Sequence, residues 1–498
     1  MDLYQESEEL EQVMADKFRI EKRLKKQIKT AMDRNDIDMA LKLAACCAQM
    51  VYMANQVYVD EQLEELTAEL AATVSVEKDY IPEDKCILFY DCFGDDTRGL
   101  ALIYLKALVQ SGYKVVYLTL QEVEGKIPTI QKVLAQADNA EIVYFQYELN
   151  KETITQLNKQ FQQYKPSVAF FYSKPQDLIG AAVFRRYEKL VKRFQINLTD
   201  HAFWVGRYSF DYCIEFRDYG ASISHYKRKL EQSRIIKLPY YPVIDQTVEF
   251  QGYPFAIEDV DKVKLIFSGG SLYKTMDAAD TYYNIVDAIL QKHSDVVFWY
   301  AGYGDGSRLL KLQEKYKERV VWTKERKDLF QVMCKCRLYL NTYPVVGGLM
   351  MQYAAVAGKL PMTLRGSDIG EGILEHQKEL GIEFISKEQL LEDIDRLLQD
   401  DAYLQMKSKG IEKTVISEQE FTNELLTILE QDSNHCEIEY RDIDTKQFQQ
   451  LYLDNFNRDT VEEIISQKKY SVLFWRFPLV YVSGAIKKIR TKIKTSHK

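Results

Sequence analysis

Three pairs of glycines lie where apolar segments of this sequence end, and glycines at such positions can form the backbone of a ligand site. The pairs are Gly269-Gly270, Gly302 with Gly304, and Gly347-Gly348. Each pair follows an apolar run with strand character and precedes a segment with helical spacing, so strand, glycine turn and helix recur three times. In parallel α/β sheets, ligands bind beyond the carboxyl ends of the strands. The glycines therefore mark a candidate ligand-binding edge.

The elements that position these glycines belong to the second of two predicted α/β domains. Residues 84–245 contain alternating apolar and helical segments and form the first domain, and residues 246–432 form the second. A proline-containing segment, 238–242, is the predicted linker between them. Residues 1–80 form a predicted helical extension, which either buries an edge of the main body or serves as an interaction module for a partner.

The composition of the chain excludes several classes of protein. The 498 residues are too many for one core, and 46% of them are hydrophobic, as in an ordinary globular protein. A net charge of −8 argues against a general nucleic-acid binder. The eight cysteines lack metal-ligand spacing, which favours buried thiols in a reducing compartment. Because no apolar run resembles a signal core or reaches membrane-spanning length, we expect a cytoplasmic protein.

The last predicted region, residues 433–498, is helical and basic. Its part 470–486 is apolar and aromatic, and five lysines and arginines follow between residues 487 and 494. This combination is typical of a segment that lies on an anionic cytoplasmic membrane surface. The alternative is a terminal helix that packs back across both domains and ends in a basic tail.

Two such domains around a proline linker resemble the GT-B glycosyltransferases. Residues 262–365 are similar to the group-1 glycosyl transferases in particular. The matching marks, in family order, are Phe267–Lys274, Tyr300–Gly306, Lys327–Phe330, and 343–349 with Gly358-Lys359-Leu360-Pro361. The resemblance implies two Rossmann-like domains that face each other across a cleft. It implies a nucleotide-sugar donor, UDP-linked, that is a substrate rather than a cofactor, and a reaction that needs no bound metal.

On this resemblance, main-chain N–H groups and a cation stabilise the diphosphate leaving group of the donor. Gly347-Gly348 is the first choice for the phosphate cradle, because glycine lets the backbone approach closely. Gly269-Gly270 with Lys274 is the second choice, and Gly302 is either a donor contact or a tight turn. Lys324 and Arg326 are further candidate cations.

The acceptor side of the resemblance lies in the first domain. The loop 93–99, with Asp95, Arg98 and Gly99, is similar to the acceptor-side glycine loop, and Asp200-His201 occurs where many of these enzymes carry a strand-end catalytic residue. An inverting transfer needs a general base, and His201 is the candidate. Neighbours on a strand point apart, so Asp200 need not orient His201, and Asp95 or Asp96 is the alternative partner for its ring. The alternative is a buried, hydrogen-bonded histidine. Glu215 and Arg217 are predicted to pair with each other.

One departure from the family pattern leaves the activity open. The retaining branch carries two glutamates eight residues apart, and no carboxylate stands at 344–346 or at Gln352 and Tyr353. Gln352 or Tyr353 is therefore a candidate for hydrogen bonds to the donor ribose. The chain is an inverting enzyme, a divergent retaining enzyme, or a non-catalytic subunit that binds an acceptor or stabilises an active partner. A nucleotide-sugar epimerase is the remaining possibility. The acceptor would be a glycan, a glycolipid or a protein.

Overall fold

The computed structural model describes residues 3–255, 263–450, 464–465, 467–479, 481–482 and 486, and it divides into two compact units. The first unit contains residues up to Leu238, then 422–442 and the described residues beyond 463. The second unit contains 239–421 and the described residues from 443 to 450. Each unit is described by itself below.

The first unit is built on a parallel sheet of seven strands in the order β3-β2-β1-β4-β5-β6-β7. The strands are β1 (Glu83–Asp91), β2 (Lys114–Leu120), β3 (Ala140–Phe145), β4 (Pro166–Tyr172), β5 (Lys192–Ile196), β6 (Tyr212–Glu215) and β7 (Ile235–Lys237). The helices between them are α4 (Ala101–Leu108), α5 (Pro128–Ala135), α6 (Lys151–Tyr164), α7 (Leu178–Arg186) and α8 (Asp218–Ser222). The central strand β1 pairs with β2 and β4, and its last six residues are buried. Strand order reverses at β1, which makes the carboxyl ends of β1 and β4 the expected place for a ligand.

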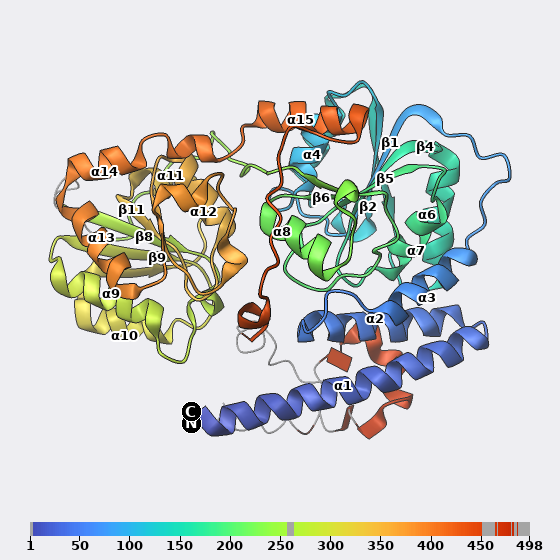
Figure 1. Cartoon of the computed structure of the whole chain (residues 1–498), viewed down its shortest axis with the longest axis horizontal. Coiled ribbons are helices and arrows are strands. Elements are labelled where there is room, and N and C mark those ends of the chain that lie inside the picture. The colour runs from blue at the N-terminus through green and yellow to red at the C-terminus, as the bar shows by residue number, and fades with distance from the viewer. Residues whose placement is uncertain are drawn as a thin grey trace. The chain divides into compact units, whose positions relative to one another are not determined.

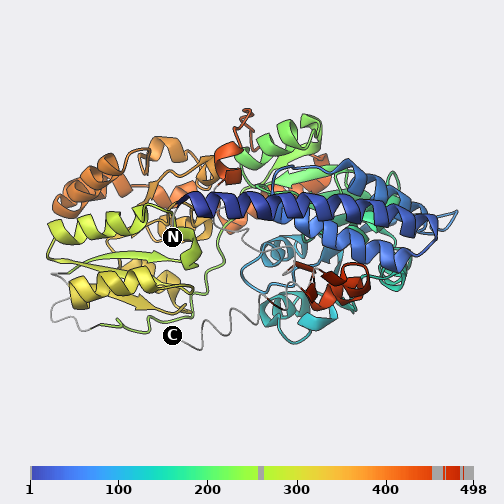
Figure 2. The ribbon, with the colours of Figure 1, turned by 90° about the horizontal axis from the view of Figure 1, so that it is seen from below.

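Three helices precede this sheet: α1 (Leu3–Asp33), α2 (Ile37–Ala54) and α3 (Glu61–Ala72). Figures 1 and 2 both show α1 and α2 side by side. Asp36 and Asp60 cap α2 and α3 by accepting hydrogen bonds from the amides of Met39 and Leu63. Helix α3 packs on α7, where Arg185 donates to the carbonyl of Glu64.

Helix α2 is unusually apolar for a helix of a globular protein. It is the one helix in the described part of the chain that is long and apolar enough to cross a membrane, with a mean hydropathy of 1.3. Two thirds of it is buried inside the first unit, and the free thiols of Cys46 and Cys47 lie on its buried surface. This burial is typical of a core helix.

The second unit contains a parallel sheet of six strands in the order β10-β9-β8-β11-β12-β13. The strands are β8 (Lys264–Gly269), β9 (Val296–Ala301), β10 (Val320–Thr323), β11 (Leu338–Leu340), β12 (Pro361–Leu364) and β13 (Glu383–Phe384). The helices are α9 (Thr281–Lys292), α10 (Ser307–Tyr316), α11 (Leu329–Lys335), α12 (Gly348–Val356), α13 (Lys387–Gln399), α14 (Asp401–Ser408) and α15 (Glu418–Gln431). Figure 1 shows α9, α10 and α13 on one side of the sheet and α11 and α12 on the other. Phe267, Trp299 and Tyr339 form the centre of its core.

The chain returns to the first unit inside α15, at Thr422. Lys192 forms an ion pair with Asp432 at 2.6 Å, and the side chain of Asn434 donates to the carbonyl of Lys237. Residues 433–445 have no helix, and Ile438 and Tyr440 pack against the cluster around Trp204. The second unit thus begins at Pro239 and ends at Phe421 before a short return at 443, whereas the sequence pattern had placed this domain at 246–432.

Candidate functional site

The first candidate region follows strand β5, at the carboxyl edge of the seven-stranded sheet. Asp200 is buried, and its carboxylate accepts a hydrogen bond from Arg217 Nε at 2.6 Å and contacts His201 Nδ1 at 3.2 Å. Burial alone would raise the pKa of Asp200, but the charge of Arg217 and the hydrogen bonds of His201 and Arg217 lower it to about 2. Asp200 is therefore a carboxylate at neutral pH and fixes the orientation of the His201 ring.

The contact between Asp200 and His201 differs from the expectation that the two side chains point apart. Strand β5 ends at Ile196, and residues 200–201 lie in a turn, so the alternation of side chains along a strand does not apply to them. Asp96, a candidate to orient His201, instead caps α5 through the amides of Thr129 and Ile130. The side chain of His201 is 29% exposed, so it is within reach of a small molecule.

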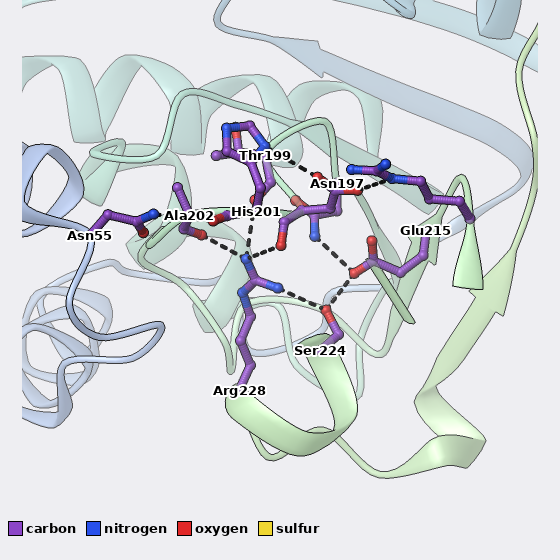
Figure 3. Close-up of polar contacts among 10 residues, drawn as sticks. Asn55, Asn197, Thr199, His201, Ala202, Glu215, Ser224 and Arg228 are labelled. Atoms are coloured by element: carbon purple, nitrogen blue, oxygen red, sulfur yellow. Dashed lines mark hydrogen bonds and ion pairs between the residues drawn. The ribbon is translucent and has the colours of Figure 1, made fainter. Parts of the chain in front are cut away.

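The backbone around His201 is held by buried polar side chains (Figure 3). The guanidinium of Arg228 donates to the carbonyls of Thr199, Asp200 and Ala202, at 3.1, 3.0 and 2.6 Å. Asn55, which follows helix α2, donates to the carbonyl of His201 at 3.3 Å. The loop is thus fixed both by its own domain and by the N-terminal helices.

Glu215 completes the buried cluster. Its carboxylate accepts hydrogen bonds from Asn197 at 2.8 Å and from Ser224, and its second oxygen has no partner in the described part of the chain. Burial raises the pKa of Glu215. The predicted pair of Glu215 with Arg217 is not formed, because Arg217 is bound to Asp200. Sequence reasoning missed Arg228 and Asn55, whose partners are main-chain carbonyls that leave no pattern in the residue types.

The loop that follows β1 carries the predicted acceptor residues. Asp95 and Arg98 are exposed, and Gly99 is buried against the hydroxyl of Tyr172. The loop is shaped by Asp91, whose carboxylate accepts from the amides of Phe93 and Gly94 and from the Tyr117 hydroxyl. Burial raises the pKa of Asp91 to about 6. This loop and His201 thus lie at the carboxyl edge of one sheet.

The second candidate region is the amino end of helix α12, in the second unit. Gly347 donates its N–H to Asn341 Oδ1 at 2.9 Å, and the first helical hydrogen bond runs from Met351 to the Gly347 carbonyl. The amides of residues 348–350 are therefore not used by the helix, and they are the groups an anion would meet. Asn341, at the end of β11, is a further residue that sequence reasoning missed.

Lys274 lies on the short 3-10 helix Leu272–Thr275 beside this helix end. Its carbonyl accepts a hydrogen bond from Val345 at 3.3 Å, which ties its backbone to the loop before α12. Burial lowers the pKa of Lys274, and the described residues offer its ammonium group no acidic partner. A partly buried cation of this kind is suited to bind an anion.

The other predicted donor-side glycines have structural roles. Gly270 donates to the carbonyl of Ala301 and accepts from the Tyr300 hydroxyl, so both its main-chain groups are engaged, while Gly269 ends β8. Gly302 donates to the carbonyl of Thr323, and a Cβ at this position would collide with the carbonyl of Gly270. Gly302 is thus a close backbone approach between two turns.

The remaining predicted donor residues lie in different settings. Arg326 is bound to Asp328 by two hydrogen bonds, of 2.8 and 2.6 Å, and donates to the carbonyl of Gly252. Lys324 is exposed and directly follows β10. Gln352 is buried, and its side chain donates to the carbonyl of Tyr240 at 2.9 Å. The hydroxyl of Tyr353 donates to the carbonyl of Val243. These two side chains hold the segment 240–243.

Among the residues that the structure describes, no three His, Cys, Asp or Glu side chains form a group that could hold a metal ion.

Comparison with known proteins gives a structural likeness. No family model matches the sequence, and no curated protein is similar to it. A solved structure of a putative UDP-N-acetylglucosamine 2-epimerase from Listeria monocytogenes has a TM-score of 0.51 at 10% identity, over 72% of this chain and all of the epimerase. A mutant O-GlcNAc transferase from Thermobaculum terrenum has a TM-score of 0.51 at 12% identity, over 87% of this chain and 82% of the transferase.

These likenesses confirm the predicted fold class. The chain has two parallel-sheet α/β domains that resemble those of GT-B glycosyltransferases, together with helical extensions. The narrower likeness to the group-1 family is not shown, because no family model matches.

Proposed function

We propose that this chain is a glycosyltransferase that moves a sugar from a nucleotide-sugar donor to an acceptor hydroxyl. The observation that carries the proposal is Lys274, a partly buried cation without an acidic partner in the described part of the chain, tied to the loop that precedes α12. A diphosphate would be stabilised by this ammonium group and by the unused amides at the start of α12. One of the two named structural neighbours is a putative UDP-N-acetylglucosamine 2-epimerase, which supports a UDP-linked donor.

In the proposed reaction the imidazole of His201 takes the proton from the acceptor hydroxyl. The hydroxyl oxygen attacks the anomeric carbon, the bond from that carbon to the diphosphate breaks, and the nucleoside diphosphate leaves. Asp200 stabilises the imidazolium that forms, because it remains ionised beside it. The direct attack predicts inversion at the anomeric carbon, and no protein nucleophile is required.

Donor binding tests this function first. We expect UDP to bind the full-length chain in a calorimetric titration, and we expect K274A to weaken binding about ten-fold or more, since a charge-assisted contact is lost. The control is K311A, which removes an exposed lysine of α10 in the same unit. Equal affinities of K274A and K311A would contradict the assigned donor site.

Transfer is tested with His201. We expect H201A to lower the rate of sugar transfer by roughly 10²- to 10⁴-fold and to leave UDP binding unchanged, because general-base catalysis contributes about that much. The readout is the nucleoside diphosphate released from a panel of nucleotide sugars with glycan, glycolipid and protein acceptors. Activity that survives in H201A would remove the histidine from the mechanism.

A second candidate function is a non-catalytic subunit of the same fold. It is favoured by Gln352 and Tyr353, which bind the carbonyls of Tyr240 and Val243 where retaining enzymes carry a carboxylate. For this function we expect UDP binding or acceptor binding without any release of nucleotide. Donor hydrolysis by the purified chain separates the two functions.

The proposed place of action is the cytoplasmic face of a membrane. Four large apolar side chains between residues 475 and 486 are exposed. They are Trp475, Leu479, Val482 and Ile486. The basic residues that follow in the sequence, from 487 to 494, lie outside the described residues. An exposed apolar stripe beside a basic segment favours an anionic bilayer surface as the partner.

A further inference from the structure

A cavity of about 690 Å³ lies inside the first unit, at the carboxyl ends of strands β1 to β4. Its floor contains residues that follow these strands, such as Cys92, Leu120 and Lys174, and its roof contains Lys42 of α2 and Tyr470 of the 3-10 helix Lys468–Trp475. The strand order reverses beside it, at β1. The cavity has the size of a small-molecule site and the place in the sheet where ligands are expected.

The roof of this cavity is fixed to the rest of the unit. The hydroxyl of Tyr470 donates to the carbonyl of Ala45 at 3.1 Å and to Gln49 Oε1 at 2.8 Å. Elsewhere in the lining, the hydroxyl of Tyr147 donates to Asp177 at 2.9 Å. Both aromatic side chains are thus anchored, and residues of the N-terminal and C-terminal extensions form part of the lining.

Three ammonium groups line the cavity without a salt-bridge partner in the described part of the chain. They belong to Lys42, Lys174 and Lys469, which come from three different segments. Burial lowers the pKa of Lys469, and the nearby charge of Lys174 lowers it further. Like charges brought together in this way gain stability when an anion binds between them.

The carboxylates in the lining form no ion pair with these lysines, although the nearby charge of Lys174 favours the ionised form of Asp177. Asp177 is buried and accepts hydrogen bonds from Tyr90, Tyr147 and the amide of Gly180. Glu148 and Glu122 are exposed, and Glu148 accepts from Asn150. None of the three lies within salt-bridge distance of a cavity lysine. An anionic group of a ligand would therefore meet unpaired positive charge.

The uncharged lining points to a ligand with hydroxyl groups. The side chains of Gln146 and Gln176 border the cavity and have no hydrogen-bond partner among the residues described. A carboxamide both donates and accepts, as a sugar hydroxyl does. The tyrosines supply aromatic surface beside these amides.

We propose that this cavity binds an anionic saccharide, a sugar that carries a phosphate or a carboxylate. Lys42, Lys174 and Lys469 bind the anionic group, and Gln146 and Gln176 bind hydroxyl groups. The choice of a saccharide among hydroxylated anions rests on the proposed function, in which the chain handles sugars. All the residues of this site belong to the first unit, whereas Lys274 and the start of α12 belong to the second.

Calorimetric titration of the full-length chain tests the proposal, with glucose 1-phosphate, glucuronate, glucose and inorganic phosphate as probes. We expect one of the two anionic sugars to bind at least ten-fold more tightly than glucose and than phosphate, and the comparison of the two identifies phosphate or carboxylate as the anion. We expect K174M and K469M each to weaken that binding at least ten-fold. The control K159A removes an exposed lysine of α6 and is expected to change nothing.

Three results would overturn the proposal: no binding of either anionic sugar, affinities that K174M and K469M leave unchanged, or phosphate binding as tight as that of the sugar phosphate. Circular dichroism and thermal unfolding of each variant verify the fold, and the two methionine variants test the site independently. UDP binding is measured in the same variants. If UDP binds and the sugars do not, the saccharide site is wrong and the donor site stands. If the sugars bind and UDP does not, the donor site is wrong and the saccharide site stands.

Discussion

At the scale of single residues, four of the buried charged side chains of the first unit lie around one short loop. Asp200, Arg217, Glu215 and Arg228 are all buried, yet only Asp200 and Arg217 form a direct ion pair. Arg228 instead saturates main-chain carbonyls and lies over the rings of Trp204 and Tyr58, at 4.9 and 5.3 Å. Buried charges are costly unless they are paired or hydrogen-bonded, so this arrangement fixes one loop geometry.

The pair of Asp200 and Arg217 predicts a pH-dependent stability. D200N removes the negative charge that the buried Arg217 guanidinium binds, and we expect it to lower the free energy of unfolding by about 3 kcal/mol at pH 7. The pKa of Asp200 is about 2, below its ordinary value, so the carboxylate stabilises the fold fully above about pH 4 and less as the pH falls toward 2. The difference between wild type and D200N, measured by calorimetry, should therefore shrink between pH 4 and pH 2.

The control for this prediction is D79N, which changes an exposed aspartate that follows α3. It should match the wild type within about 0.5 kcal/mol at every pH. A difference for D200N that is constant from pH 7 to pH 2 would show that Asp200 does not titrate as an ion pair.

Arg228 carries a second prediction at this scale. R228K keeps the charge but cannot reach three carbonyls and Ser224 together, and we expect it to destabilise the chain by roughly 3 kcal/mol. Amide hydrogen exchange should report faster opening of residues 199–202 in this variant. The adjacent exposed Lys229 provides the control, K229A, for which no such change is expected. Unaltered exchange in R228K would mean that the loop is held by other contacts.

At the scale of elements, the glycine turns of the second unit divide into two kinds. Gly302 faces the carbonyl of Gly270 so closely that any side chain displaces the backbone, whereas Gly347 has a φ of −95° and space for a Cβ. We expect G302A to lower the free energy of unfolding by about 2–3 kcal/mol and G347A to lower it by less than about 1 kcal/mol. Differential scanning calorimetry of the full chain measures both.

This pair of variants also separates structure from binding. G347A adds a methyl group at the predicted phosphate cradle, so we expect weaker UDP binding despite near-normal stability. If G302A unfolds as the wild type does, the close approach of the two turns is not a constraint on the fold.

The elements themselves could be predicted well from the sequence, and the partners of side chains could not. Apolar runs and glycines gave the strands β8, β9 and β11 and the helix α12, because periodicity and turn preference act locally. The contact between Asp200 and His201 depends on where β5 ends. If the strand ended a few residues later, the two side chains would be expected to point apart. Gln352 and Arg326 have candidate ligand chemistry, but the tertiary fold uses them to hold Tyr240 and Gly252.

At the scale of the whole chain, the first unit is assembled from segments that lie hundreds of residues apart. Arg23 of α1 donates to the carbonyl of Arg476, and Tyr470 binds the carbonyl of Ala45. Such contacts leave no local pattern in the sequence. For this reason the sequence pattern placed residues 422–432 in the second domain and 433–442 in the C-terminal extension, although both belong to the first unit. They also place the apolar stripe of 475–486 on the same unit as the N-terminal helices.

Membrane binding is the prediction that belongs to this scale. Trp475 and Leu479 are 85% and 82% exposed, and transfer of their side chains into a bilayer interface is favourable. We expect the full chain to sediment with vesicles that contain anionic phosphatidylserine, and W475A/L479A to bind at least ten-fold more weakly. The variant F18A, which removes another exposed aromatic side chain on α1, serves as the control.

Binding to neutral vesicles should be weaker, and high salt should reduce binding to anionic ones, since each basic residue near the surface contributes about 1 kcal/mol. Equal sedimentation of the wild type and W475A/L479A would place the stripe against a protein partner or leave it in solvent, and the membrane would no longer be part of the proposed function.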